Sequence, residues 1–113
     1  MSKNLHILSF QQKLKAEKQF LQSLLCKKIA RRKLILEKAS NKQVHLLQKL
    51  LVLFVRGDIE VQTHFINRLK RSKKLRFVEE KFNKVKKDPD LKKNLISLVS
   101  VLPLFVKIIL KKK

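Results

Sequence analysis

Glycine and proline are scarce in this sequence, which contains a single glycine, Gly57, and two prolines, Pro89 and Pro103. An antiparallel sheet needs many tight turns, and those turns are built largely from these two residue types. Leu, Lys, Gln and Glu, which favour helices, are abundant instead. The composition therefore predicts an all-α fold.

Cysteine and the larger aromatic residues are also nearly missing. Cys26 stands alone, so the 113 residues form no intramolecular disulfide and no cysteine-based metal cage, and a reducing compartment is expected. Trp and Tyr are absent, so only Phe side chains could stack on unpaired bases, and the hydrophobic core needs those Phe residues. This absence argues against base-specific recognition of single strands.

No pattern typical of an enzyme is present. His6, His45 and His64 lie too far apart along the chain to form a metal motif, and no Gly-rich phosphate loop occurs. No nucleophile has a plausible base at a diagnostic spacing, and no carboxylate pair suits acid–base chemistry. We therefore expect no catalysis, no cofactor and no metal ion.

Acidic residues are few as well. The chain has 8 Asp and Glu but 29 Lys and Arg, which gives a formal net charge of +21. Such a surplus repels itself unless an anionic partner neutralises it. Hydrophobic residues still make up 44% of the chain, so it has the material for a core that a disordered basic tail lacks. A small folded protein that binds a polyanion is predicted.

Residues 1–39 are expected to form a basic N-terminal helix. From about Phe10 to Ala39, leucines and isoleucines recur at roughly helical spacing between polar residues. Its second half contains a basic cluster that we predict to contact phosphates: Lys27, Lys28, Arg31, Arg32 and Lys33. Residues 1–10 show no long apolar run after a basic stretch and no small-residue cleavage site, so we expect cytoplasmic synthesis without secretion.

Residues 40–87 are expected to form a helical core. Ser40 and Gln43 have the spacing of a capping box, and the apolar helix that follows ends near Gly57, which tolerates a positive φ. Asp58 can cap the next helix, which begins near Glu60 and can break near Ser72 before the apolar pattern continues to Val85.

The densest basic patch of the sequence falls on this third helix. Six cations occur within nine residues: Arg68, Lys70, Arg71, Lys73, Lys74 and Arg76. Closely spaced cations release condensed counterions when they meet a nucleic-acid backbone, so we predict that they contact phosphates. The alternative interpretation is a helix face that is only solvated.

Residues 88–113 are expected to form an apolar C-terminal helix with a Lys-rich end. Asp88-Pro89-Asp90 suits the first turn of a helix, and Pro103 interrupts the apolar run, which is too short to span a bilayer comfortably. The helix can pack on the core, or it can meet an anionic membrane or a capsid protein. The residues predicted for such a contact are Leu95, Ile96, Leu98, Val99, Leu102, Leu104, Phe105, Ile108 and Ile109.

The order of these features resembles a known group of small basic proteins. The segments that carry the resemblance are Leu36 to Ser40 followed by Lys42-Gln43-Val44, the apolar helix that ends at Arg56-Gly57-Asp58-Ile59, the basic stretch from Leu69 to Arg76, and the apolar tail. Over about residues 34 to 110 the chain is similar to basic proteins of Polinton (Maverick) and adintovirus-like elements, which have been likened to the core protein X (mu) of adenoviruses. Where that group carries a Gly pair before the tail, this chain has Lys92-Lys93-Asn94.

The resemblance implies a virion-associated protein, found in the virion or the host nucleus, that accompanies a double-stranded DNA genome. The favoured function is sequence-independent binding and neutralisation of double-stranded DNA. One alternative is a membrane-active or capsid-scaffold protein that acts through the apolar C-terminal helix. Another is an RNA-associated basic protein, because phosphate charge alone does not separate RNA from DNA. Homo-oligomerisation stays open.

Overall fold

Helices make up the regular structure of the chain in the computed structural model, which describes residues 12–57, 63–84 and 86–111. After a helical segment at residues 12–16, the helices are α2 (Lys18–Ser23), α3 (Ile29–Glu37), α4 (Asn41–Val55), α5 (Thr63–Arg71), α6 (Leu75–Lys81), α7 (Leu91–Ile96) and α8 (Leu102–Lys111). No strand occurs among the described residues, and the all-α prediction is confirmed.

Helix α4 forms the middle of the fold and begins and ends where the sequence predicts. The Gln43 amide donates to Ser40 Oγ over 3.2 Å, and the Ser40 amide donates to Gln43 Oε1 over 3.0 Å, so the capping box is present. The helix ends at Val55, and Gly57 follows its C-cap, Arg56, with a φ of 78°. The predicted cap at Asp58 and the predicted start of the next helix near Glu60 lie outside the described residues.

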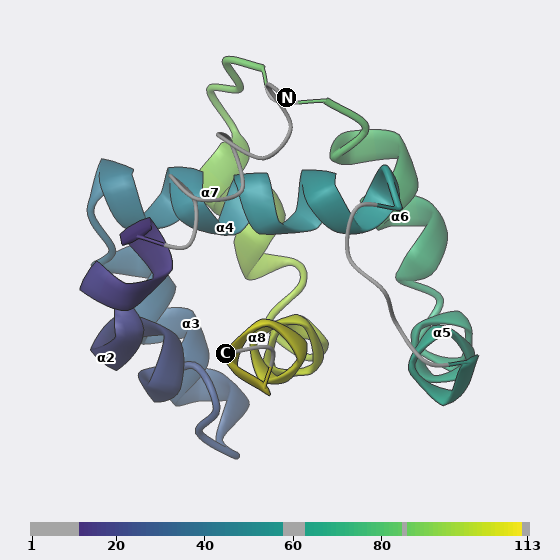
Figure 1. Ribbon diagram of the computed structural model, residues 1–113, viewed down its shortest axis with the longest axis horizontal. Coiled ribbons are helices and arrows are strands. Elements are labelled where there is room, and N and C mark those ends of the chain that lie inside the picture. The colour runs from purple at the N-terminus through teal and green to yellow at the C-terminus, as the bar shows by residue number, and fades with distance from the viewer. Residues whose placement is uncertain (1–11, 58–62, 85, 112–113) are drawn as a thin grey trace.

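The other helices surround α4. Figure 1 shows α4 lying across the molecule, with α2 and α3 toward one end, α5 and α6 toward the other, and α8 below it. Helix α7 packs against both α3 and α4, and α6 packs against α4 and α5. The apolar side chains of α4 are buried on several sides as a result, with Leu47, Leu50 and Leu51 almost fully enclosed.

The N-terminal third is not the single long helix that the sequence predicts. The chain leaves helical geometry at Glu17 and again from Leu24 to Lys28, which separates α2 from α3. A straight helix of 30 residues would be about 45 Å long, whereas the longest dimension of the molecule is 40 Å. Folding back at these breaks allows Leu21, Leu24 and Leu36 all to reach the core, where each is fully buried.

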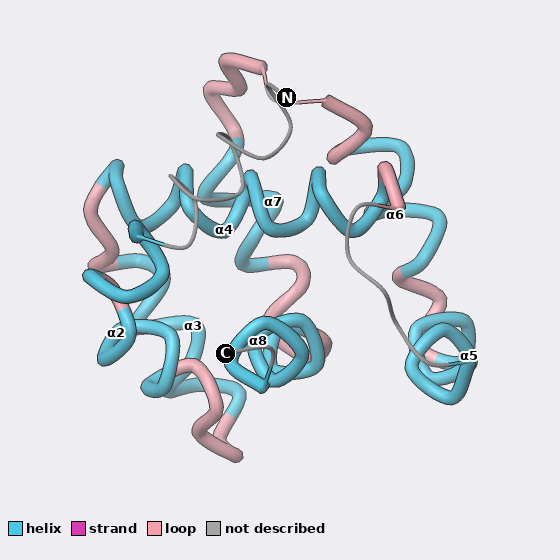
Figure 2. The backbone as a smooth tube through the Cα atoms, viewed as in Figure 1, coloured by secondary structure: helices cyan, strands magenta, loops and turns pink. Residues whose placement is uncertain are grey.

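The apolar C-terminal segment is two helices, not one. Figure 2 shows the loop that separates α7 from α8, and it covers residues 97–101. The break therefore precedes Pro103, which lies in the first turn of α8, where its missing N–H is not needed for helical hydrogen bonds. Asp88 precedes α7 and accepts hydrogen bonds at 2.9 Å from the Asp90 amide and at 2.9 Å from Asn94 Nδ2.

Helix α8 is docked on the core through three aromatic rings. Phe105 of α8 meets Phe54 of α4 at a centroid distance of 5.0 Å and Phe65 of α5 at 5.2 Å, and the latter two rings lie 5.5 Å apart. All three pairs are edge-to-face, the arrangement that aromatic quadrupoles favour. Among the described residues, no helix is both long enough and apolar enough to cross a membrane.

Polar contacts join α3 to the C-terminal segment. Arg32 donates through Nη1 to the Val99 carbonyl, and Lys92 Nζ donates to the carbonyls of Glu37 and Ala39 at 3.0 and 3.1 Å. These pairs show that α3 and α7 run antiparallel, with the Lys92 ammonium at the negative end of the α3 dipole. The Cα radius of gyration is 13.2 Å, which matches the roughly 13 Å expected for a compact chain of this length.

Candidate polyanion-binding surfaces

The predicted basic patch folds into a corner between two helices, which we call the α5–α6 surface. It comprises Arg68, Lys70 and Arg71 in the last turn of α5, Lys73 and Lys74 in the connecting turn, and Arg76 in α6. All of these side chains are exposed except Lys74, which is half-buried. Cations at the C-terminal end of a helix are favoured by its dipole, so the three on α5 also stabilise that helix. The patch is therefore open to solvent and supported by its own helix.

A tight turn fixes the angle between α5 and α6, at the break that the sequence predicts near Ser72. The Lys74 amide donates to the Leu69 carbonyl over 3.2 Å, and the Lys73 amide donates to the Lys70 carbonyl over 3.1 Å. This hydrogen-bond pair defines a Schellman motif, in which the residue at the left-handed position is usually glycine. Here that residue is Lys73, with a φ of 61°. The turn thus places an exposed cation at a strained backbone position.

Acidic neighbours neutralise little of the α5–α6 surface. Arg76 Nε lies 3.1 Å from Glu80 Oε1, one turn further along α6, and the two side chains are 90% and 63% exposed. An exposed pair of this kind contributes at most about 1 kcal/mol. A polyanion can therefore displace Glu80 from Arg76 at small cost.

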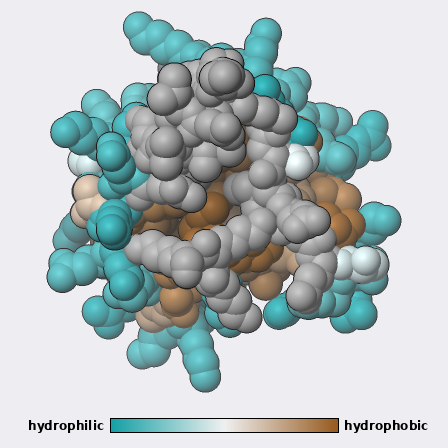
Figure 3. Space-filling view, viewed as in Figure 1, coloured by the Kyte–Doolittle hydropathy of each residue, from teal (hydrophilic) through white to brown (hydrophobic). Residues whose placement is uncertain are grey.

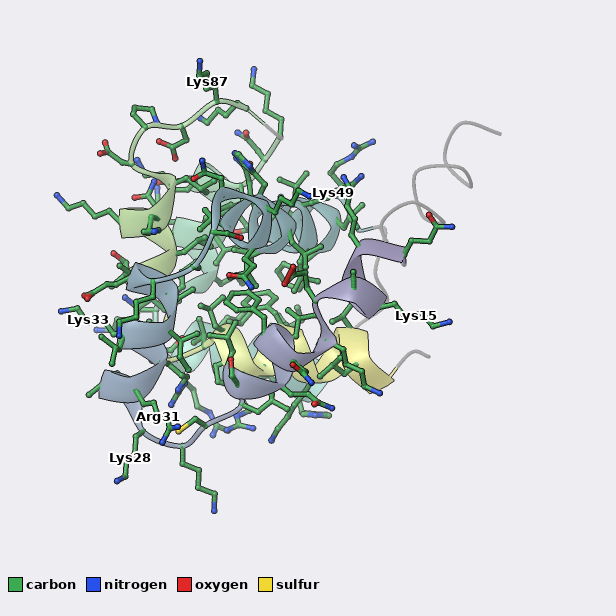
Figure 4. The ribbon with its side chains drawn as sticks, turned by 90° about the vertical axis from the view of Figure 1, so that its left-hand side faces the viewer. Lys15, Lys28, Arg31, Lys33, Lys49 and Lys87 are labelled. Atoms are coloured by element: carbon green, nitrogen blue, oxygen red, sulfur yellow. The ribbon has the colours of Figure 1, made fainter. Side chains whose placement is uncertain are left out.

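The second predicted cluster is exposed with one exception, and we call its exposed members the α3 surface. They are Lys27, Lys28, Arg31 and Lys33, from the turn before α3 and from its first half. Figure 4 looks onto this end of the molecule and shows Lys28, Arg31 and Lys33 extending outward on the same side. These four exposed cations lie within positions 27–33, at and just before the start of α3.

The prediction that Arg32 contacts phosphate is wrong for the folded protein. Only 7% of the residue is exposed, and its guanidinium donates to the carbonyls of Val99 and Lys27. Because residues three and four apart share a helix face, Arg32 points inward with Leu36 while Arg31 and Lys33 point outward. Arg32 joins α3 to the C-terminal segment instead of meeting a ligand.

Exposed cations also lie outside the two surfaces. Figure 4 shows Lys15 and Lys87 projecting on other sides of the molecule than Lys28, Arg31 and Lys33. Lys15 and Lys87 are both exposed. Figure 3 shows hydrophilic side chains around much of the outline of its view, with hydrophobic residues between them in places.

The apolar residues predicted to meet a membrane or a partner lie in the core or against it. The buried ones are Leu95, Leu98, Val99, Leu102 and Phe105, and the half-buried ones are Ile96, Leu104, Ile108 and Ile109. The folded protein therefore does not present them as one exposed face. They become available to a membrane only if α7 and α8 leave the core.

The described residues contain no group of three or more His, Cys, Asp and Glu side chains that could hold a metal ion. No protein-family model, curated protein or solved structure matches the chain. The charge and packing of its own side chains are thus the observations from which a function can be inferred.

Proposed function

We propose that the protein binds double-stranded DNA without regard to sequence and neutralises its charge. The observation that carries this proposal is the contrast between the two kinds of predicted contact residue. Nearly all the clustered cations are exposed, whereas the apolar C-terminal residues pack into or against the core. The surface that the fold offers to a partner is therefore cationic, and closely spaced cations suit a phosphate backbone.

The size and the charge of the protein also fit a duplex. Its longest dimension is 40 Å, and double-stranded DNA carries one phosphate charge per about 1.7 Å, so a duplex of equal length has about 24 charges. The formal net charge of the chain is +21. One protein thus nearly neutralises the length of duplex along which it can lie, as a protein that packages DNA must do.

The choice of DNA among polyanions and the setting of the protein follow from the family resemblance. Basic proteins of Polinton-like elements accompany a double-stranded DNA genome, so we place this chain in a virion core or beside a capsid, in the virion or the host nucleus. A membrane-active role is supported less well. It would require Leu95, Leu102 and Phe105 to leave the core in which they are buried.

The test is to remove the clustered cations and to compare the result with removal of the same charge elsewhere. One variant carries Gln at eight clustered positions: 27, 28, 31, 33, 68, 70, 71 and 73. The control carries Gln at eight exposed lysines outside the two surfaces: Lys18, Lys38, Lys42, Lys81, Lys84, Lys86, Lys93 and Lys107. Circular dichroism of both variants checks that the helices remain.

The clustered variant should bind a duplex more than about 100-fold more weakly than the control at about 0.1 M salt. Each phosphate contact strengthens binding by about eightfold when the salt concentration falls from 1 M to 0.1 M. A difference in affinity of about 100-fold at 0.1 M salt therefore corresponds to the loss of two or more contacts. Equal affinities for the two variants would show that net charge alone drives binding and that the two surfaces are not the contact sites.

A further inference from the structure

One serine hydroxyl lies in the middle of the α5–α6 surface. Ser72 is exposed in the turn after α5, and all six cations of the surface are within four residues of it along the chain. Its Oγ donates to the Leu69 carbonyl over 2.8 Å. No Asp or Glu occurs between Thr63 and Val78. The Ser72 hydroxyl is thus surrounded by positive charge that no acidic residue of this stretch balances.

Other exposed serines of the described residues have different surroundings. Ser97 is exposed after α7, and its Oγ donates to the Lys93 carbonyl over 3.2 Å. Ser100 is exposed as well, and the residues next to both serines in the chain are apolar. The Oγ of Ser40 serves as the N-cap of α4. Clustered cations on both sides therefore distinguish Ser72.

We propose that Ser72 is a phosphorylation site, modified by a serine kinase that recognises basic substrates, and that its phosphate weakens DNA binding by the α5–α6 surface. The proposal rests on the proposed function and adds its regulation. Kinases discriminate among substrates by the charge pattern around the modified residue. The cations at both sides of Ser72 suit a kinase whose substrate site is acidic.

The modification is a phosphoryl transfer from ATP. The Ser72 oxygen bonds to the γ-phosphorus of ATP, and the bond from that phosphorus to the oxygen bridging the β- and γ-phosphates breaks. ADP leaves, and the hydroxyl proton passes to the catalytic base of the kinase. Transfer also removes the hydrogen bond that Ser72 Oγ donates to the Leu69 carbonyl.

A phosphate on Ser72 competes with DNA for the neighbouring cations. It carries about two negative charges at pH 7 and has three oxygens that accept charge-assisted hydrogen bonds from Arg and Lys. Arg71 and Lys73, the adjacent residues, are both exposed. Loss of one or two contacts with DNA corresponds to about 8- to 60-fold weaker binding at about 0.1 M salt.

The first experiment locates the modification. The full chain is incubated with protein kinase C, a kinase that accepts serines between basic residues, and with ATP, and mass spectrometry of fragments identifies the modified residues. Ser72 should be the main site in the wild-type protein. Ser97→Ala should take up as much phosphate as wild type, whereas Ser72→Ala should lose most of the uptake.

The second experiment measures duplex binding by fluorescence anisotropy at about 0.1 M salt. Phosphorylated wild type should bind at least about eightfold more weakly than unmodified protein, and a phosphatase should restore the affinity. Ser72→Glu and Ser97→Glu are a matched pair, because each adds one negative charge and removes a hydroxyl that donates to a backbone carbonyl. Ser72→Glu should bind at least about threefold more weakly than Ser97→Glu, since its charge is added among contact residues.

Two results would overturn the phosphorylation switch while leaving DNA binding intact. In the first, the folded protein takes up no phosphate at Ser72, or takes up as much at Ser97. In the second, the phosphorylated protein binds the duplex as tightly as the unmodified protein. If the unmodified protein does not bind the duplex, the proposed function fails and the switch fails with it, whereas mass spectrometry still decides whether Ser72 is a modification site.

Discussion

Replacement of Phe105 by Ala tests whether the apolar C-terminal segment belongs to the core. Phe105 is 2% exposed and contacts two other aromatic rings at centroid distances of 5.0 and 5.2 Å. Truncation of a buried Phe to Ala costs about 3–5 kcal/mol, and the two edge-to-face contacts place this site in the upper part of that range. Small domains are stable by only about 5–15 kcal/mol, so the loss would be a large fraction of the total.

Urea denaturation followed by far-UV circular dichroism measures the change in the free energy of unfolding. Ile108→Ala on the same helix is the matched control, because Ile108 is half-buried and its truncation should cost only about 1–2 kcal/mol. If Phe105→Ala costs less than about 1 kcal/mol, α8 is not packed on the core in solution. The burial argument against a membrane-active tail would then be lost.

Three further predictions concern a helix cap, a strained turn and the charge balance. Ser40→Ala removes one half of the capping box and should lower the free energy of unfolding by about 1 kcal/mol in the same denaturation assay. Lys73→Gly should raise it by about 0.5–1 kcal/mol by relieving the left-handed backbone, whereas Lys73→Ala, which also removes the charge but keeps the β-carbon, should give no such gain. Because the net charge is +21 and each base pair carries two phosphates, electrophoretic mobility of the complex should reach zero near one protein per about 10 base pairs. A neutral point near one protein per 5 base pairs would mean that half of the charge does not reach the DNA.

The parts of the fold that local chemistry decides could be predicted from the sequence. The Ser40–Gln43 capping box and the glycine stop at Gly57 depend on residues within one helical turn, and both are present. The break near Ser72 was also predictable, but its left-handed residue was not, because a lysine gives no signal for that conformation. Tertiary packing determined that detail.

The breaks in the N-terminal third could not be predicted because no glycine or proline marks them. Leu21 and Leu36 lie 15 residues apart, which is about 22 Å along a straight helix, yet both must reach the same small core. The loop at residues 97–101 has a similar origin, since Leu95 and Leu102 on either side of it and Leu98 within it are all fully buried. In both places the need to bury leucines outweighs local helix propensity.

The candidate site could be predicted where cations are close together in sequence. The α5–α6 surface matches the predicted patch because its six cations span only nine residues. Arg32 was misassigned because composition cannot tell which member of a run of cations faces inward.

The salt dependence of duplex binding tests the phosphate-backbone mechanism most directly. The association constant of the wild-type protein is measured at several salt concentrations for two duplexes of unrelated sequence. With about four to six phosphate contacts at one surface, the logarithm of the association constant should fall with the logarithm of salt concentration at a slope of about −3.5 to −5.5, equally for both duplexes. A slope shallower than about −2.5, or a preference of more than about tenfold for one duplex, would contradict binding through the phosphate backbone.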